Sequence, residues 1–419
     1  MRLIARAAWA RLVSAAAALT LLGAACGPAA QPSTAPSQPT APPAARLTTT
    51  PAAKEVAGPV RIGAAGPYTG NLANIGSDML DAQKFAVEEW NNTNGGLFGR
   101  DVEVVEGDDQ GDPQNAATVA EKFVSDPAIV GVVGPGTSGA VKAALPIYDR
   151  ANLPIISASA TNPDLSMTGA KVFHRVCPTD ADQGPAIASF MVQDLKVQGA
   201  AMVDDKGTYS VGLADEVERK LKELGIGKIE RFSVTPDEKD FSQILTRIKA
   251  ANFDIVFTPL PNTAQAVAFA RQMKQLGVDA KQMGGDGLFD KTEMIDKANG
   301  STEGVYVSFI GPDVKGIPDA TAFVDKYRKR FGRDPGTFAA QTYEATTILL
   351  GAIQKAGIKN GKIDRQAVND AVSTTNNYKG ILGIPIAFTE RGDLKGGTIF
   401  IFQVQGKEFK QLKSVNASQ

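Results

Sequence analysis

The sequence predicts an α/β protein of two doubly wound lobes, each built on a parallel sheet with helices on both faces, and three observations carry this prediction. Short β-branched runs alternate with amphipathic segments along most of the chain, which is typical of parallel strands joined by helical crossovers. From about residue 58 onward, the 419-residue chain is too long for one average domain and suits two. The alternation continues on both sides of about residue 178, so we expect one sheet before this point and one after it.

The N-terminus is typical of an export signal. Three arginines precede an apolar run over residues 12–22, about half of the roughly 20 residues that a membrane-spanning helix needs. Leu22–Cys26 is similar to a bacterial lipobox, in which the cysteine is lipidated and becomes the new N-terminus. Gly23 stands where leucine is usual, so ordinary secretory cleavage is the alternative. We expect residues 1–25 to be a lipoprotein signal peptide and Cys26 to anchor the protein to a membrane, in the periplasm or at the cell surface.

Residues 26–57 predict a disordered tether. They are rich in Pro, Ala, Ser and Thr and contain almost no large apolar side chain, so they cannot bury a core. Between the coil and polyproline limits, such a segment reaches roughly 30 to 100 Å.

The predicted strands are short runs of β-branched or other apolar residues bounded by turn residues. They cover residues 60–64, 102–105, 129–133, 153–156, 200–203, 229–234, 254–258, 305–309 and 399–404. The predicted helices between them carry an apolar stripe at helical spacing, clearest over 78–90, where it consists of Met79, Ala82, Phe85, Ala86 and Trp90. The other helices are expected over residues 113–124, 138–148, 183–195, 209–224, 241–250, 263–276 and 322–331.

Composition argues against several classes of function. The 44 basic and 45 acidic residues nearly balance, and no basic cluster or aromatic–basic interleaving indicates a nucleic-acid partner. The single histidine, His174, lies in an apolar run, and Cys177 suits a buried small position, so a zinc site is not expected and a histidine-based catalytic triad is possible only through His174. The acidic cluster Asp108–Asp112 lacks the spacing of a calcium loop and predicts a strand-end acid pair with a helix cap at Asp112. We expect no enzyme activity, cofactor or metal.

The segment Val132–Gly139 predicts an anion site. A short strand breaks at two glycines and a helix opens at Ser138, where unpaired N–H groups and the helix dipole favour negative charge. A dinucleotide phosphate is one candidate, because Gly134–Gly139 satisfies G-x-G-x-x-G. That alternative requires an acid about 20 residues further on, whereas the next strand ends in Ser157–Thr161 without one. A small carboxylate therefore fits this site better than a dinucleotide phosphate. This argues against an exported nicotinamide-dependent oxidoreductase.

Three hydroxyls are expected at the same cleft edge. Ser138 lies at the helix start, and Ser159 and Thr161 follow the adjacent predicted strand. Hydroxyl and amide donors recognise a carboxylate at modest desolvation cost. The structural alternative is that Ser138 only caps the helix and that residues 159–161 only form a loop.

In this order and spacing, a set of short motifs makes the chain resemble the branched-chain amino-acid-binding proteins of bacterial ABC importers. The resemblance covers residues 60–402. Its motifs are Gly66–Gly70 with Gly76, Gly95–Gly99, Asp108–Pro113, Pro154–Thr161, Asp180–Gly184, Asp205–Tyr209, Lys239–Phe241 and Gly392–Gly396.

The resemblance implies a type I periplasmic binding protein fold, in which three crossings of a hinge join two lobes around an amino acid. Lobe 1 then comprises residues 58–177 and 309–392, and lobe 2 comprises residues 178–308 and 393–419. The family's carboxylate-binding serine falls on Ser138, and its Ala-x-Thr segment falls on Ser159, Ala160 and Thr161. Its cleft tyrosine falls on Tyr209, and the acid that pairs with the ligand ammonium falls on Asp286.

The pocket for the ligand side chain departs from the family. Ile75 and Pro261 replace common aromatics, while Phe338 and Tyr68 remain. The resemblance implies an extracytoplasmic monomer that binds an aliphatic amino acid and delivers it to an ABC-transporter permease. A different amino acid, an amide or a urea-like solute stays open as the ligand, and a sensory receptor module stays open as the role.

Overall fold

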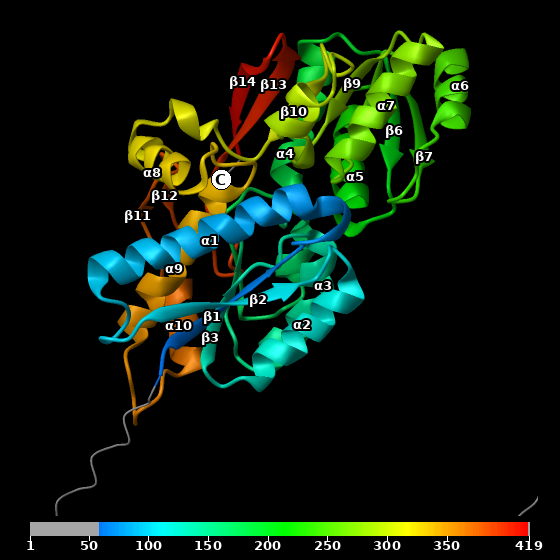
Figure 1. Ribbon diagram of the computed structural model, residues 1–419. Coiled ribbons are helices and arrows are strands. Elements are labelled where there is room, and N and C mark those ends of the chain that lie inside the picture. Colours follow the sequence, from blue (N-terminus) through cyan, green and yellow to red (C-terminus); the bar gives the residue numbers. More distant parts are fainter. Residues whose placement is uncertain (1–57, 418–419) are drawn as a thin grey trace, which may run out of the picture. The chain divides into compact units, whose positions relative to one another are not determined.

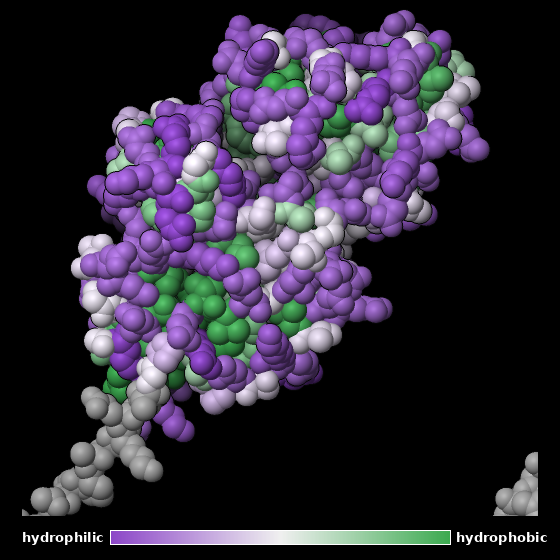
Figure 2. All heavy atoms as spheres, viewed as in Figure 1, coloured by the Kyte–Doolittle hydropathy of each residue, from purple (hydrophilic) through white to green (hydrophobic). Residues whose placement is uncertain are grey.

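The computed structural model describes residues 58–417 (Figure 1). The predicted signal peptide, Cys26 and the predicted tether lie outside the described residues. Within 58–417, no helix combines the length and apolarity needed to cross a membrane. Figure 2 shows a face covered mostly by hydrophilic side chains, with hydrophobic atoms visible in the region of α1 and β2.

The first sheet is entirely parallel, with strand order β2-β1-β3-β4-β5. Its strands are β1 (Val60–Gly66), β2 (Val102–Asp108), β3 (Ile129–Val133), β4 (Ile155–Ser157) and β5 (Phe173–Arg175). Helices α1 (Ala73–Asn94), α2 (Pro113–Ser125) and α3 (Ser138–Arg150) connect them.

Strands β3, β4 and β5 of this sheet are fully buried, whereas the edge strand β2 is partly exposed. In β3, Ile129 and Val132 belong to the apolar cluster that contains α2 and α3 residues, whereas Val130 and Val133 belong to the cluster that contains α1 residues. The members of each pair are three positions apart, so the regular alternation of the pleat is interrupted within β3, and the pairing of β1 with β3 shifts register at the same place. In Figure 1, α1 lies on one side of β1–β3, and α2 and α3 lie on the other.

The second sheet has strand order β14-β13-β10-β9-β8-β6-β7. Its parallel strands are β6 (Gly199–Asp204), β7 (Lys228–Ser233), β8 (Ile255–Thr258), β9 (Lys281–Gly284) and β10 (Tyr306–Phe309). The accompanying helices are α4 (Asp180–Gln193), α5 (Thr208–Glu223), α6 (Ser242–Ala251) and α7 (Thr263–Leu276). Both sheets with their helices match the predicted α/β class.

Two antiparallel strands extend the second sheet, which the prediction of parallel sheets did not include. β13 (Thr398–Gln405) pairs antiparallel with β10, and β14 (Glu408–Asn416) pairs antiparallel with β13. Gly406 and Lys407 connect the two in a tight turn, with Gly406 at φ 64°. A hairpin this short is possible only between antiparallel strands.

After β10 the chain returns to the first sheet. Helix α8 (Thr321–Phe331) places three aromatic rings around Phe85 of α1, and α9 (Ala339–Ala356) and α10 (Arg365–Ser373) pack against β3. A small antiparallel pair, β11 (Tyr378–Lys379) and β12 (Pro385–Ile386), follows.

Several elements that the sequence prediction missed lack the expected local pattern, although the missed helix α10 is clearly amphipathic. Helix α9 has no clear polar face because it is buried by α1, α10 and the sheet, so its apolar residues do not form a single stripe. Strand β9 has no β-branched residue, and β14 is a largely exposed edge strand with many polar side chains. Strand β5 is only three residues long.

Candidate functional site

A cleft of about 540 Å³ lies at the carboxyl ends of strands from both sheets. From the first sheet it is bordered by the segment Gly136–Gly139 after β3 and by Ser159 after β4. From the second sheet it is bordered by the segment Asp205–Ser210 after β6 and by Asp286 after β9. This is the edge at which open parallel sheets bind ligands.

Ser138 presents donors to the cleft and is not the cap of α3. The cap is Thr137, whose hydroxyl accepts a hydrogen bond from the Ala140 N–H at 3.2 Å, so the alternative that Ser138 only caps the helix is wrong. The Ser138 hydroxyl accepts from the Asn162 N–H at 3.3 Å, which leaves its own hydrogen available to an acceptor in the cleft. The N–H groups of Ser138 and Gly139 lie in the first helical turn, where no helical carbonyl can accept from them. The arrangement suits a carboxylate.

The segment Ser159–Thr161 after β4 contributes less to the cleft surface than expected. The Ser159 hydroxyl borders the cleft but donates to the Gly136 carbonyl at 2.7 Å, so its hydrogen is already used. Ala160 and Thr161 are fully buried and do not border the cleft. The structure therefore brings Ser138 and Ser159 to the cleft wall and leaves Ala160 and Thr161 beneath it.

Asp286 presents a carboxylate oxygen without a partner. It begins a short helical turn after β9, and only 3% of its surface is exposed. Its Oδ1 accepts from Gln183 Nε2 at 2.7 Å, whereas its Oδ2 accepts no hydrogen bond from residues 58–417. Burial raises the pKa of Asp286 to about 7, and the Gln183 amide opposes this rise. A buried carboxylate with a free oxygen is a site for a cation.

Tyr209, at the start of α5, borders the cleft beside Asp286. Its hydroxyl oxygen accepts from the Asp286 backbone N–H at 3.0 Å. Gly285 makes this approach possible, because a Cβ at that position would lie 2.2 Å from the Tyr209 oxygen. Tyr209 and Asp286 therefore come together as expected.

The sequence analysis did not predict two residues that lie next to Asp286. Gln183 shares its amide between Asp286 and the Ser308 hydroxyl, at 2.7 and 3.0 Å. Asp180, one turn earlier on α4, is fully buried, and both of its carboxyl oxygens lack a hydrogen-bond partner within the described chain. Burial raises the pKa of Asp180 to about 8. The Asp180–Gly184 motif contributed to the family resemblance, but it did not predict that this turn of α4 contacts Asp286.

The expected side-chain pocket is partly assembled. Ile75, Pro261 and Phe338 border the cleft, as do Pro67 and Leu72. Tyr68 does not border the cleft: its ring packs against β1, where a Cβ on Gly66 would lie 2.9 Å from it.

Two asparagines near the start of α1 form hydrogen bonds across the rim of the cleft. Asn71 Nδ2 donates to Asp237 Oδ1 at 2.6 Å, and Asn74 Nδ2 donates to Asp290 Oδ2 at 2.7 Å. Both aspartates belong to loops of the second sheet, so these bonds join the two sides of the cleft. No sequence motif pointed to either pair.

The remaining candidate groups have structural positions. Asp112 caps α2 by accepting from two backbone N–H groups, as predicted, and Asp108 accepts from the Tyr68 N–H at 2.9 Å. Cys177 is fully buried, and His174 is a core residue whose Nε2 lies 3.0 Å from the Ser373 hydroxyl. Burial lowers the pKa of His174 to about 4.

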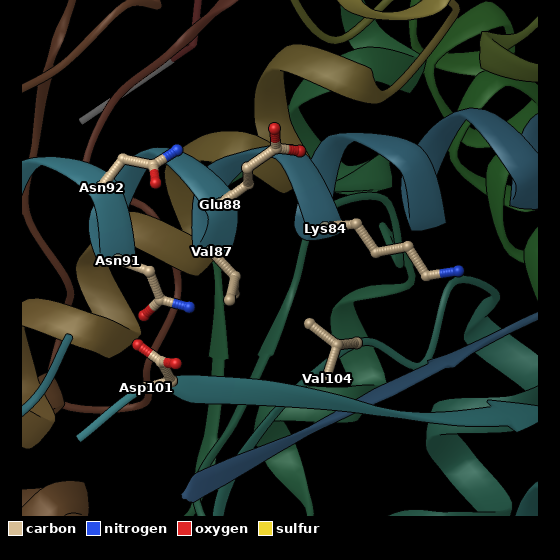
Figure 3. A pocket seen from close by; sticks show the side chains of 7 residues that line it. All are labelled: Lys84, Val87, Glu88, Asn91, Asn92, Asp101 and Val104. Atoms are coloured by element: carbon tan, nitrogen blue, oxygen red, sulfur yellow. The ribbon is translucent and has the colours of Figure 1, made fainter. Parts of the chain in front are cut away.

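A second hollow of about 510 Å³ lies on the surface between α1 and β2 (Figure 3). Three of its polar side chains already have partners: Asn91 donates to and accepts from the Val102 backbone, Lys84 pairs with Glu106 at 2.6 Å, and Glu88 pairs with Arg330 at 2.9 Å. It lies beside α1 and an edge strand rather than at the strand ends. We therefore assign the functional site to the cleft.

Comparisons with known proteins agree with this fold. Residues 59–408 match a family model described as a periplasmic binding protein. The chain is 32% identical over 336 residues to Leu/Ile/Val-binding protein homolog 1 of Brucella melitensis, covering 80% of this chain and 88% of that protein. It superposes with a TM-score of 0.76 on a leucine-binding protein, LivK, of Thermotoga maritima, at 26% identity over 85% of this chain and 98% of that one. The TM-score is also 0.76 for LivJ of Streptococcus pneumoniae in complex with isoleucine, at 25% identity over 85% and 99%.

Proposed function

The chain belongs to the periplasmic binding protein family, and we propose that it captures a branched-chain or other aliphatic amino acid and delivers it to an ABC-transporter permease. As a member of this family it is an extracytoplasmic solute-binding protein and not an enzyme. The observation that carries the choice of ligand is the free Oδ2 of Asp286, a buried acceptor that needs a cationic donor. The ligands named for LivK and LivJ, leucine and isoleucine, each have an ammonium group.

In the proposed complex, the cleft holds the two charged ends of a zwitterion at opposite walls. The Ser138 hydroxyl and the first N–H groups of α3 receive the carboxylate, and Asp286 receives the ammonium beside the Tyr209 ring. Ile75, Pro261 and Phe338 provide apolar contacts for the aliphatic side chain.

The proposed lobes are residues 58–177 with 309–392 and residues 178–308 with 393–419. Sheet order supports this division, because the chain leaves the first sheet after β5, returns to it through α8–α10 after β10, and ends in the second sheet. Only closed lobes satisfy both ends of the ligand, so the amino acid shifts an open–closed equilibrium by its preference for the closed form.

We further propose that the protein is a monomer anchored by lipid at Cys26. Mass spectrometry of membrane-extracted protein should find a diacylated Cys26 as the first residue, and Cys26→Ser should release the protein into the soluble fraction. An intact or differently cleaved N-terminus without lipid would contradict the anchor.

A thermal-shift screen tests the function. The twenty amino acids, their amides and urea are added to the full chain, and an aliphatic amino acid should raise Tm by linkage. Leucinamide should bind at least tenfold more weakly than leucine in calorimetry, because it lacks the carboxylate. Preference for an amide or urea would move the assignment to that solute class, and stabilisation by none of these compounds would contradict the proposal. A permease gene beside this one would favour transport over a sensory role.

A further inference from the structure

We propose that Arg175 is the positioning residue that holds the carboxylate side of the cleft in its binding geometry, although its side chain does not border the cleft. This inference rests on the proposed function, since it names a residue that acts on the same site. Arg175 is the last residue of β5, and its side chain is fully buried. No sequence motif indicated a role for it.

One nitrogen of Arg175 holds the carbonyl groups on either side of Thr161. Its Nη1 donates to the Ala160 carbonyl at 2.9 Å and to the Asn162 carbonyl at 2.8 Å. The Thr161 carbonyl between them accepts from the Asp180 N–H at 2.9 Å. Three successive carbonyls of the 160–162 segment are therefore fixed by buried donors.

The fixed carbonyls determine where the intervening N–H groups point. A trans peptide is planar, so its N–H points opposite to its carbonyl. Because the Thr161 carbonyl is held by Asp180, the Asn162 N–H is directed the other way, and there it donates to the Ser138 hydroxyl. This bond occupies one lone pair of that hydroxyl and leaves its hydrogen for the ligand. Arg175 holds the carbonyls of the two peptides that flank this one, so it acts on the Asn162 N–H and on Ser138 by fixing the segment on both sides.

The charge of Arg175 is balanced from a distant part of the chain. Its Nε and Nη2 lie 2.7 and 2.6 Å from Asp393 Oδ1, across 218 positions of sequence. Gly392 permits this approach, because a Cβ there would lie 1.9 Å from the Phe173 carbonyl oxygen and its φ is 82°. The segment is also tied to β5 by the bond from the Arg175 N–H to the Gly392 carbonyl at 2.9 Å. A buried guanidinium is tolerated only with such complete pairing.

The chain contains a matched control. Arg365 of α10 also donates its guanidinium to several backbone carbonyls, among them those of Ile129 at 2.9 Å and Asp126 at 2.7 Å. These carbonyls lie at or before the start of β3, whereas the cleft lies beyond the end of that strand. Replacing Arg365 removes a comparable set of bonds without touching the 160–162 segment.

The experiment compares Arg175→Met and Arg365→Met in the full chain by calorimetry with L-leucine and by hydrogen exchange. Arg175→Met should weaken leucine binding at least tenfold and speed amide exchange in residues 158–162, while Arg365→Met should change affinity less than twofold and leave that exchange unaltered. Arg175→Lys keeps the charge opposite Asp393 but cannot reach all the acceptors, so it should show a smaller effect in the same direction. It replaces the methionine variant if that variant does not fold.

Equal loss of affinity in the Arg175 and Arg365 variants would overturn the inference, since it would show a general loss of stability. Unchanged affinity and exchange in both Arg175 variants would also overturn it. If the unsubstituted protein binds no amino acid, the proposed function fails, whereas the exchange comparison still decides whether Arg175 fixes the 160–162 segment.

Discussion

The cleft wall that follows the first sheet and the wall that follows the second offer a solute different chemistry. At Ser138, the first wall presents a hydroxyl and helix N–H groups, which are neutral donors that do not titrate. The second wall presents Asp286, a buried carboxyl with one free oxygen and a pKa raised to about 7. The difference teaches that the two ends of a zwitterion can be recognised by unlike means, and that only one wall makes binding depend on pH.

The largest expected loss of affinity comes from removing the charge of the second wall. Asp286→Asn removes the negative charge opposite the ligand ammonium, and breaking a buried pair in this way costs about 3 kcal/mol. Leucine affinity should therefore fall by about 100-fold in calorimetry. Unchanged affinity would remove Asp286 from the site. Asp109→Asn, which alters a buried acid at the end of β2 with one unpartnered oxygen, is the control and should keep its affinity.

A pH titration sharpens the contrast between the walls. Because burial raises the pKa of Asp286 to about 7, its carboxyl is protonated below that pH and must lose the proton to pair with an ammonium. Leucine affinity should fall as the pH is lowered below about 7, approaching tenfold per pH unit, and should level off above it.

Two variants assign the titrating group in that experiment. Asp286→Asn should give a flat profile over the same range, measured by calorimetry from pH 5 to 8. Asp180→Asn should keep the acid-side loss of affinity, although Asp180 is the neighbouring buried acid with a raised pKa. Loss of the pH dependence in the Asp180 variant alone would transfer the effect from Asp286 to Asp180.

The neutral wall should contribute less. Ser138→Ala removes one hydrogen bond to a carboxylate, a bond worth about 1.5 kcal/mol, so leucine affinity should drop about tenfold. Leucinamide has no carboxylate to accept a hydrogen bond from Ser138. Its weak binding should therefore change much less in the same variant. An equal loss for both ligands would show that Ser138 does not face the carboxylate.

The smallest expected effect concerns a hydrogen bond across the rim of the cleft, between Asn74 and Asp290. Asn74→Ala removes the 2.7 Å bond to Asp290, which joins the two sides of the cleft, and should weaken leucine binding about threefold through faster dissociation if the lobes open to release the ligand. Stopped-flow measurement should find the association rate unchanged. Ser77→Ala on the same helix removes a hydroxyl that bonds only to the Asn74 carbonyl and serves as the control. Faster dissociation in both variants would point to α1 itself rather than to the bond with Asp290.

Much of the fold and part of the site followed from local patterns. The helix start at Ser138 and the cap at Asp112 agree with predictions from local patterns. Tyr209 and Asp286 border one cleft, as the family resemblance implied. The prediction did not include Gln183 beside Asp286, because the two lie 103 positions apart and their contact depends on how α4 packs against the second sheet. The commitment of the Ser159 hydroxyl to the Gly136 carbonyl was missed for a similar reason.

The sequence by itself determined the alternation of strands and helices, because hydrophobic periodicity and helix caps depend on residues a few positions apart. It also determined which residue types stand at the strand ends. Only the tertiary structure decided which of their polar atoms are already bonded and which remain free, as Asp286 Oδ2 does. Burial and hydrogen bonding are set by segments that fold together from distant parts of the chain, as Arg175 and Asp393 do across 218 positions.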